Sequence, residues 1–267
     1  MAAFADKVVV ITGASQGIGL ALARTLASER PKLVLAARDA VRLEDVAAEC
    51  RGRGAQALVV PTDVASFEDC RALVDRAVAH YGGLDVLVNN AGVGMIARFD
   101  EVQDLEAYDR LMRVNYLSCV HLTHRALPHL KRSRGLLVAV ASLAGLTGVP
   151  TRTAYAASKH AVIGFFDSLR IELLGTGVAV TIVAPDFVAS QIHKRAIGPD
   201  GTALGKTPMQ ESRIMSAERC AELILDAMRK RSRLAVFSAR GRLGRYARLV
   251  TPGLIDRIAL RAVRQGK

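Results

Sequence analysis

The chain has few of the residues that mark several classes of protein. It contains no tryptophan, four cysteines, and no apolar run that approaches the length needed to cross a bilayer. The cysteines are scattered without a C-x-x-C pair, which argues against a disulfide framework and favours a reducing compartment such as the cytoplasm. The six histidines do not cluster with carboxylates, so no metal site is expected. The first residues lack the charged region, apolar stretch and cleavage site of a signal peptide.

Acidic residues are almost missing from the end of the chain. Residues 229–267 contain 12 Lys and Arg but one acid, Asp256, whereas the preceding residues are nearly neutral. The net charge of +12 is therefore a property of the tail. With 267 residues, 51% of them hydrophobic, the chain can bury one large core. We expect a single domain over residues 1–238 and a basic extension over residues 239–267.

Short apolar runs alternate with longer segments of helical periodicity. Continuous apolar strands separated by helices predict a Rossmann-type α/β fold, a doubly wound parallel sheet of about seven strands with helices on both faces. Residues 185–215 interrupt the pattern and predict a substrate loop or lid. The expected strands are Val8–Thr12, Leu33–Ala36, Ala57–Val60, Leu84–Val88, Leu136–Ala141, Ala179–Val183 and Leu234–Phe237. The expected helices lie near residues 17–29, 40–51, 67–80, 105–130, 153–174 and 217–230.

The first predicted strand runs into a glycine-rich loop. The segment Thr12–Gly19, with the sequence TGASQGIG, lies between that strand and the first predicted helix. Glycines let the backbone turn tightly and let a pyrophosphate approach the N-terminus of a helix. The spacing G-x3-G-x-G differs from the G-x-G-x-x-G of the general dinucleotide fingerprint.

Tyr155 and Lys159 are four residues apart, and Ser142 lies upstream of them. On a helix, positions i and i+4 share a face. A phenol has an ordinary pKa of about 10, and a neighbouring ammonium lowers such a pKa. A phenol tuned in this way can exchange a proton with an alcohol or carbonyl oxygen, which Ser142 could hold. Because such pairs also occur by chance on helix surfaces, the interpretation depends on the rest of the chain.

These motifs follow the order found in a known family. The chain resembles the short-chain dehydrogenases/reductases over roughly residues 6–240, and its stretch Tyr155–Leu173 is most similar to members that act on steroids, retinoids and other lipophilic carbonyls. The resemblance implies an NAD(P)-dependent oxidoreductase that forms a homodimer or homotetramer. The residues that carry it are Thr12–Gly19, Asp63, Asn89–Gly92, Asn115, Ser142, Tyr155, Lys159 and Pro185.

The resemblance implies catalytic roles for four residues. Tyr155 would be the acid/base, and Ser142 would orient the substrate oxygen. Lys159 would hold the nicotinamide ribose and tune Tyr155. Asn115 would hold a water that relays protons to Lys159. From the residues alone, Asn115 would be a polar residue that kinks a long helix.

The resemblance also implies a cofactor site. Asp63 would bind the adenine amine, the alternative being a cap of the next helix. Asn90 and Ala91 would pass behind the adenosine ribose, the alternative being a simple turn. Val188 would offer its backbone to the nicotinamide carboxamide, and Ser190 would replace a family threonine. The expected cofactor residues are Gly13, Ser15, Gln16, Gly17, Ile18, Gly19, Arg38, Asp63, Val64, Asn90, Ala91, Gly92, Tyr155, Lys159, Pro185, Val188 and Ser190.

Two neighbouring residues bear on the choice of cofactor. An acid about twenty residues past the glycine loop would bind the 2′-hydroxyl of NAD. Ala37 occupies that position, and Arg38 after it can pair with a 2′-phosphate. We therefore expect NADP(H), with NAD(H) as the alternative. Asp39, and a glutamine rather than a lysine at Gln16, argue the other way.

The residues expected around the substrate are largely apolar. They favour a lipophilic ketone, aldehyde or secondary alcohol over a sugar or a charged acid. The family usually has Pro-Gly after the sixth strand, whereas Asp186 follows Pro185 here. Asp186 either places a carboxylate near the substrate or cofactor, or caps a turn. The expected substrate residues are Val93, Met95, Leu143, Val149, Asp186 and Phe187.

Two other functions remain open. Within the same chemistry, the alternative is a 3-oxoacyl-thioester (acyl-carrier-protein) reductase. From another class, the alternative is a non-catalytic scaffold or sensor that binds nucleotide without turnover. The complete set of four catalytic residues argues against that second alternative, because a protein without catalysis has no physical need for all four.

The basic tail has a helical pattern of its own. Arg257, Arg261 and Arg264 fall on one face of a predicted amphipathic helix. Such a helix could contact an anionic membrane surface, a partner subunit or an acidic carrier protein, or be a solvated terminus. No nucleic-acid partner is expected, because the tail has one aromatic residue, Tyr246, and no recognition module.

Overall fold

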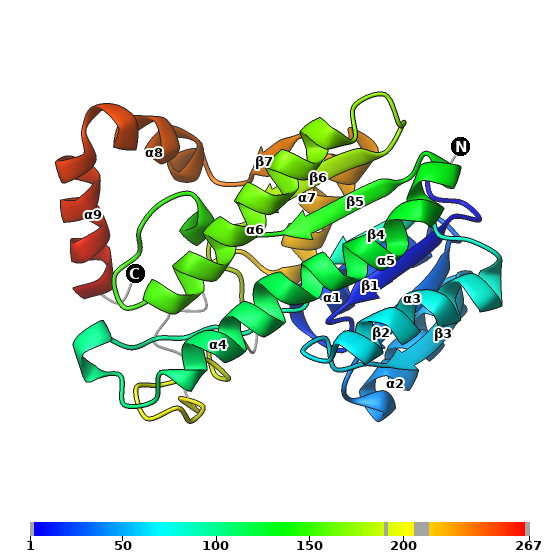
Figure 1. Cartoon of the computed structure of the whole chain (residues 1–267), viewed down its shortest axis with the longest axis horizontal. Helices are drawn as coiled ribbons and strands as arrows, with labels where there is room; N and C mark the ends of the chain where they lie inside the picture. The colour runs from blue at the N-terminus through cyan, green and yellow to red at the C-terminus, as the bar shows by residue number, and fades with distance from the viewer. Residues whose placement is uncertain (1–2, 190–191, 206–213, 265–267) are drawn as a thin grey trace.

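The computed structural model describes residues 3–189, 192–205 and 214–264. Seven parallel strands form one sheet in the order β3-β2-β1-β4-β5-β6-β7 (Figure 1). This order, which reverses at β1, confirms the expected doubly wound sheet. The strands are β1 (Val8–Thr12), β2 (Lys32–Ala37), β3 (Gln56–Pro61), β4 (Val86–Asn89), β5 (Leu136–Val140), β6 (Ala179–Ala184) and β7 (Leu234–Val236).

The central strands are continuous apolar runs because helices cover both faces of the sheet. Every residue of β1, β4 and β5 is buried, as expected for parallel strands buried on both sides. One face packs against α1 (Gly17–Ala27), α2 (Ala40–Gly52) and α7 (Ala217–Arg229). The other face packs against α3 (Phe67–Tyr81), α5 (Ser118–Ser133) and α6 (Thr153–Glu172).

The long helix predicted over residues 105–130 is divided in the structure. It consists of α4 (Glu106–Met112), a π-helical segment η2 (Arg113–Leu117) and α5. A π-helical turn holds one more residue than an α-helical turn and so shifts the side chains that follow it. Asn115 lies in this turn, which places the irregularity beside the residues of the candidate site.

The segment between β6 and α7 lies beside the chain that follows β4. The backbone of Ile197 accepts a hydrogen bond from Ile96 N and donates one to Gly94 O, both at 2.9 Å. At the two ends of the same segment, Val188 and Met215 pair in an isolated β-bridge. The described parts of the predicted loop over residues 185–215 are thus held at the carboxyl edge of the sheet.

The C-terminal extension forms two helices, α8 (Ala239–Val250) and α9 (Pro252–Arg264), which stand away from the sheet at one end of the molecule (Figure 1). Ser238 caps α8 by accepting a hydrogen bond from Gly241 N. Gly241 packs tightly on the body, since a Cβ there would lie 2.6 Å from Leu143 Cδ2. Within the described part of the chain, no helix is long and apolar enough to span a membrane.

Candidate active site

A cavity of about 710 Å³ lies at the carboxyl ends of the strands, where open α/β sheets bind their ligands. Its walls come from the loops that follow the strands and from α8 and α9. One residue assigned to the cofactor from the sequence does not line it, because Gly19 packs behind the glycine loop; another, Ser190, lies outside the described residues. The others do: Gly13, Ser15, Gln16, Gly17, Ile18, Arg38, Asp63, Val64, Asn90, Ala91, Gly92, Tyr155, Lys159, Pro185 and Val188.

The glycine loop after β1 adopts backbone angles that would be strained for a residue with a side chain. Gly13 and Gly17 have φ of +67° and +54°, in the left-handed region that glycine adopts freely. A Cβ on Gly19 would lie 2.3 Å from the Gly13 carbonyl oxygen. Among the described residues, no side chain caps α1, and its first turn carries no acid. The first N–H groups of α1 therefore remain available to an anion such as a pyrophosphate.

The hydroxyl of Thr12 joins the ends of β1 and β4. It accepts hydrogen bonds from Asn90 N and Ala91 N, each at 3.0 Å, and donates to Val88 O at 3.2 Å. The Asn90 side chain in turn donates to Thr12 O at 2.8 Å. This network fixes the backbone on which the expected adenosine ribose would rest, so Asn90 and Ala91 do more than end a strand.

Arg38 and Asp39 both line the cavity after β2, but their side chains are engaged differently. Asp39 is the N-cap of α2: its carboxylate accepts from Arg42 N at 3.1 Å and pairs with the Arg42 guanidinium at 3.3 Å. Among the described residues, nothing forms a hydrogen bond or ion pair with the exposed Arg38 side chain. The guanidinium is therefore available to a ligand, whereas the carboxylate is occupied.

Asp63 lies on the cavity wall and does not cap the following helix. Its carboxylate accepts from Ala65 N at 3.0 Å, and its own N–H donates to Asp69 at 2.9 Å. Ser66 is the N-cap of α3 and accepts from Asp69 N. The alternative role as a helix cap is thereby excluded, and the adenine contact stays a prediction.

Ser142, Tyr155 and Lys159 reach the same cavity from β5 and α6. Lys159 is 4% exposed, and its ammonium donates to Val140 O at 2.9 Å. The Lys159 ammonium lies 5.9 Å from the centre of the Tyr155 ring. The Ser142 hydroxyl accepts from Ala144 N at 3.2 Å. A hydroxyl, a phenol and an ammonium thus line the same cavity.

Asn115 lies behind the cavity wall. It is 1% exposed, and its amide exchanges two hydrogen bonds with the backbone of Val93, at 2.8 and 3.0 Å. It also donates to Ser158 Oγ at 2.9 Å. A Cβ on Gly92 would lie 3.2 Å from Asn115 Oδ1 and 3.7 Å from Lys159 Nζ. The amide therefore clamps the segment after β4 to α6, and the proton relay through it stays a prediction.

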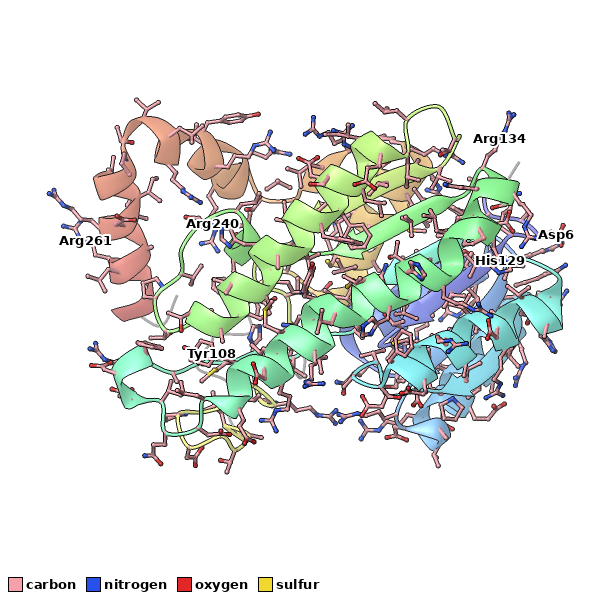
Figure 2. All side chains as sticks on the ribbon, in the orientation of Figure 1. Asp6, Tyr108, His129, Arg134, Arg240 and Arg261 are labelled. Carbon is pink, nitrogen blue, oxygen red and sulfur yellow. The ribbon has the colours of Figure 1, made fainter. Side chains whose placement is uncertain are left out.

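Asp186 lines the cavity and is held by the C-terminal extension. Its carboxylate accepts hydrogen bonds from Arg240 Nε and Nη2 at 2.6 and 2.8 Å, and from Phe187 N at 2.9 Å. The bond to Asp186 raises the pKa of Arg240. Figure 2 shows Arg240 where the C-terminal helices meet the body. Asp186 therefore lies on the cavity wall with its carboxylate engaged, and its role toward substrate or cofactor stays a prediction.

The residues expected at the substrate do not all reach the cavity. Val93, Leu143, Val149 and Phe187 line it together with Asp186. Met95 is 2% exposed and packs in a separate apolar cluster, where it pairs with Ile197 in a β-bridge. Sequence pattern alone could not distinguish a cavity residue from a core residue in this apolar stretch.

A model of the family described as "short chain dehydrogenase" matches residues 7–198. The chain belongs to the short-chain dehydrogenase/reductase family. It is an oxidoreductase of that family. It is 35% identical over 259 residues to a "Dehydrogenase/reductase SDR family protein 7-like" of Dictyostelium discoideum, covering 95% of this chain and 80% of that protein. It is 36% identical over 257 residues to an "11-beta-hydroxysteroid dehydrogenase" of Pinus massoniana, covering 94% and 72%.

Solved structures of short-chain dehydrogenases/reductases share this fold. One from Burkholderia phymatum, in complex with NAD, superposes with a TM-score of 0.83 at 28% identity and covers 95% of this chain and 96% of its own. An alcohol dehydrogenase from the archaeon Thermococcus sibiricus, complexed with 5-hydroxy-NADP, gives a TM-score of 0.75 at 29% identity, covering 86% and 94%.

In this short-chain dehydrogenase/reductase, Arg152 and two residues of α9 are among the cavity residues that the sequence did not identify. Arg152 lies one residue before α6 and three before Tyr155, a spacing that is visible in the sequence. Ile255 and Ile258 come from α9, far along the chain, and no local pattern links them to the site. The C-terminal extension is thus part of the active-site wall.

Proposed function

We propose that the protein is an NADP(H)-dependent oxidoreductase that interconverts a lipophilic ketone or aldehyde and the corresponding alcohol. One observation carries the proposal: Ser142, Tyr155 and Lys159 converge in the same cavity as the glycine loop. A cofactor extended from the loop along the wall would bring its reactive end to these three side chains. Hydride transfer needs that juxtaposition of cofactor site and proton donor.

The residues of the glycine loop fit a dinucleotide. The left-handed glycines leave the backbone exposed to the ligand, and the start of α1 attracts its negative charge. The side-chain oxygen of Gln16 is buried without a hydrogen-bond partner among the described residues. A bound donor such as a ribose hydroxyl would satisfy this acceptor.

The chain's own residues supply position and proton. A bound nicotinamide supplies the hydride chemistry. Ser142 holds the substrate oxygen by a hydrogen bond, and Tyr155 exchanges a proton with that oxygen. Lys159 is fixed by Val140 O and presents positive charge beneath the phenol. Asn115 holds the segment after β4 and α6 in register, which keeps these groups in place.

The preference for NADP(H) rests on Arg38 and Asp39. The 2′-phosphate of NADP would meet a guanidinium that has no partner among the described residues. The neighbouring carboxylate, which would repel that phosphate, is held by Arg42 as the cap of α2.

The lipophilic substrate is supported by the far end of the cavity. Val149, Phe187, Ile255 and Ile258 present apolar surface there. A steroid-sized or similar carbonyl compound fits this wall better than a sugar, which needs many hydrogen-bonding groups.

Assembly and membrane contact are part of the proposal. Related proteins associate through helices equivalent to the predicted segments 105–130 and 153–174, and we propose a homodimer or homotetramer of the same kind. We also propose that α8 and α9 contact an anionic membrane surface. Large apolar side chains are exposed on them beside arginines, and Figure 2 shows Arg261 pointing away from the body. The exposed apolar residues are Leu243, Tyr246, Leu249, Val250, Leu254, Ile258 and Leu260.

The decisive experiment replaces Tyr155 by Phe. We expect turnover of a ketone panel, followed by NADPH absorbance, to fall by about 10²–10⁴-fold because the proton donor is lost. NADPH binding, measured by fluorescence, should be little affected. The panel includes a 3-oxoacyl thioester, and a preference for it would favour the thioester reductase.

The matched control is Tyr108→Phe. This variant also removes a phenolic hydroxyl near the start of α6. The Tyr108 hydroxyl is hydrogen-bonded to Thr153 Oγ1 at 2.6 Å, but Tyr108 does not line the cavity. Near-normal rates in Tyr155→Phe, or an equal loss in both variants, would contradict the mechanism.

A further inference from the structure

Arg152 is the one arginine that is buried among the described residues, with 8% of its surface exposed. It lies at the N-cap position of α6 and lines the cavity beside Tyr155. Its guanidinium lies over the ring of Phe187, 5.3 Å from the ring centre. The charge therefore faces the cavity beside Phe187, one of the residues expected at the substrate.

The guanidinium of Arg152 has no hydrogen bond or ion pair with any residue that the structure describes. Two exposed arginines of α8 do have partners, since Arg240 binds Asp186 and Arg248 donates to Leu146 O. Burial lowers the pKa of Arg152. A buried charge that contacts an aromatic ring but has no hydrogen-bond or ionic partner is costly, so stability alone does not account for an arginine here.

The surroundings add positive charge. Asp186, the carboxylate nearest in sequence on this wall, is occupied by Arg240. Arg245 also lines the cavity, and its Nε is buried without a partner among the described residues. No side chain from the described part of the chain caps the start of α6, so its free N–H groups add to the positive potential.

We propose that Arg152 forms an anion subsite for the substrate, so that the substrate is a lipophilic carbonyl compound carrying a carboxylate. The guanidinium binds the carboxylate through paired hydrogen bonds. Apolar residues of the cavity wall, such as Val149 and Leu146, hold the hydrocarbon between the acid and the reacting carbonyl. This inference rests on the proposed function for the reaction, and it revises the uncharged substrate that the apolar residues alone suggest.

The first test compares acids with their methyl esters as substrates. The probes are phenyl ketones that carry a terminal carboxylate on alkyl chains of increasing length. We expect one length to be preferred, and the acid-to-ester ratio of kcat/KM to fall by about tenfold or more in Arg152→Gln, mainly through KM. Because the methyl ester keeps the carbonyl acceptor and loses only the negative charge, the acid-to-ester ratio of kcat/KM reports the contribution of that charge.

The matched control is Arg219→Gln on α7. It removes the same charge from an exposed arginine that pairs with Glu222 and does not line the cavity. The acid-to-ester ratio should remain that of the wild type. An equal loss for acids and esters in Arg152→Gln would overturn the subsite and place Arg152 in support of Tyr155.

The second test needs no turnover. Phenylalkanoates, which have no carbonyl to reduce, are titrated into the full-length protein by calorimetry. Arg152→Gln should weaken their binding by about tenfold or more, whereas Arg219→Gln should not. Acid binding that depends on Arg152 without any turnover would retain the subsite and reject the proposed function. Turnover of neutral ketones together with equal acid binding in all variants would support the proposed function and reject the subsite.

Ligand-free stability provides a third readout. Arg152→Met replaces an unpaired buried charge with an apolar side chain of similar length. The melting temperature should stay the same or rise, as for a residue retained for binding rather than stability. A clear fall in the melting temperature, together with unchanged acid binding, would make Arg152 a structural residue.

Discussion

The two ends of the cavity are built in different ways. At the cofactor end, the wall is largely backbone held by short contacts, such as the glycine loop against Gly19 and the Thr12 hydroxyl against β4. At the substrate end, the wall consists of side chains from loops and from α8 and α9, joined to the body by an ion pair at Asp186. Under the proposed function, rigid backbone would place the cofactor, whereas substrate selection would depend on parts that can change without disturbing the sheet.

The largest expected effect comes from the cofactor end. Gly19→Ala would place a Cβ 2.3 Å from a backbone oxygen that cannot move independently of β1. We expect the free energy of unfolding to fall by about 3 kcal/mol and NADPH binding to be lost. Chemical denaturation and cofactor fluorescence measure the two effects.

Gly52→Ala is the control for that substitution. Gly52 ends α2, and a Cβ there would meet nothing within 4 Å. Replacing a helical glycine by alanine stabilises a protein by about 0.5–1 kcal/mol. Equal effects of the two substitutions would show that the cofactor end is less rigid than its contacts indicate.

The next effect concerns cofactor choice. Ala37→Asp introduces a carboxylate at the end of β2, beside Arg38. It would repel a 2′-phosphate and accept the ribose hydroxyls of NADH. We expect the ratio of kcat/KM for NADPH over NADH to fall by about 100-fold, equivalent to about 2.7 kcal/mol. A wild-type protein that already prefers NADH would contradict the role of Arg38.

A smaller effect follows from removing the substrate-end wall. Deleting residues 239–267 removes Ile255 and Ile258 from the cavity but leaves all seven strands. We expect KM for a lipophilic ketone to rise by about tenfold while NADPH binding is retained. Sedimentation with anionic vesicles should fall to the level seen with neutral vesicles. A deletion that abolishes NADPH binding would mean that the two ends are not independent.

The smallest effect is at the link between α8 and the body. Asp186→Asn, Arg240→Gln and the double variant form a cycle, which we expect to give a coupling energy of about 1 kcal/mol because Arg240 is exposed to solvent. The coupling, measured through KM, should decrease at high salt. The absence of coupling would leave Gly241 as the main attachment of α8.

The comparison also explains what the sequence could predict. The glycine loop and the Tyr155–Lys159 pair are local patterns, because their spacing reflects a single turn or helix. The pairing of Asp186 with Arg240 spans 54 positions, and the burial of Arg152 depends on packing around α6. The π-helical turn likewise contains Asn115, whose amide bonds to Val93 and Ser158 outside that turn, so a local pattern does not reveal these partners.

The position of α8 and α9 has a consequence for how the protein is made. A chain emerges from the ribosome N-terminus first, and folding proceeds in the same direction. The cofactor end can therefore assemble before the residues that complete the substrate wall have been synthesised. A proteolytic cut after Ser238 would leave a folded protein that binds cofactor but has an open substrate site. In Figure 1, α9 lies at one end of the molecule and the start of β1 lies toward the other end, so the last-made helix is far from the first-made strand.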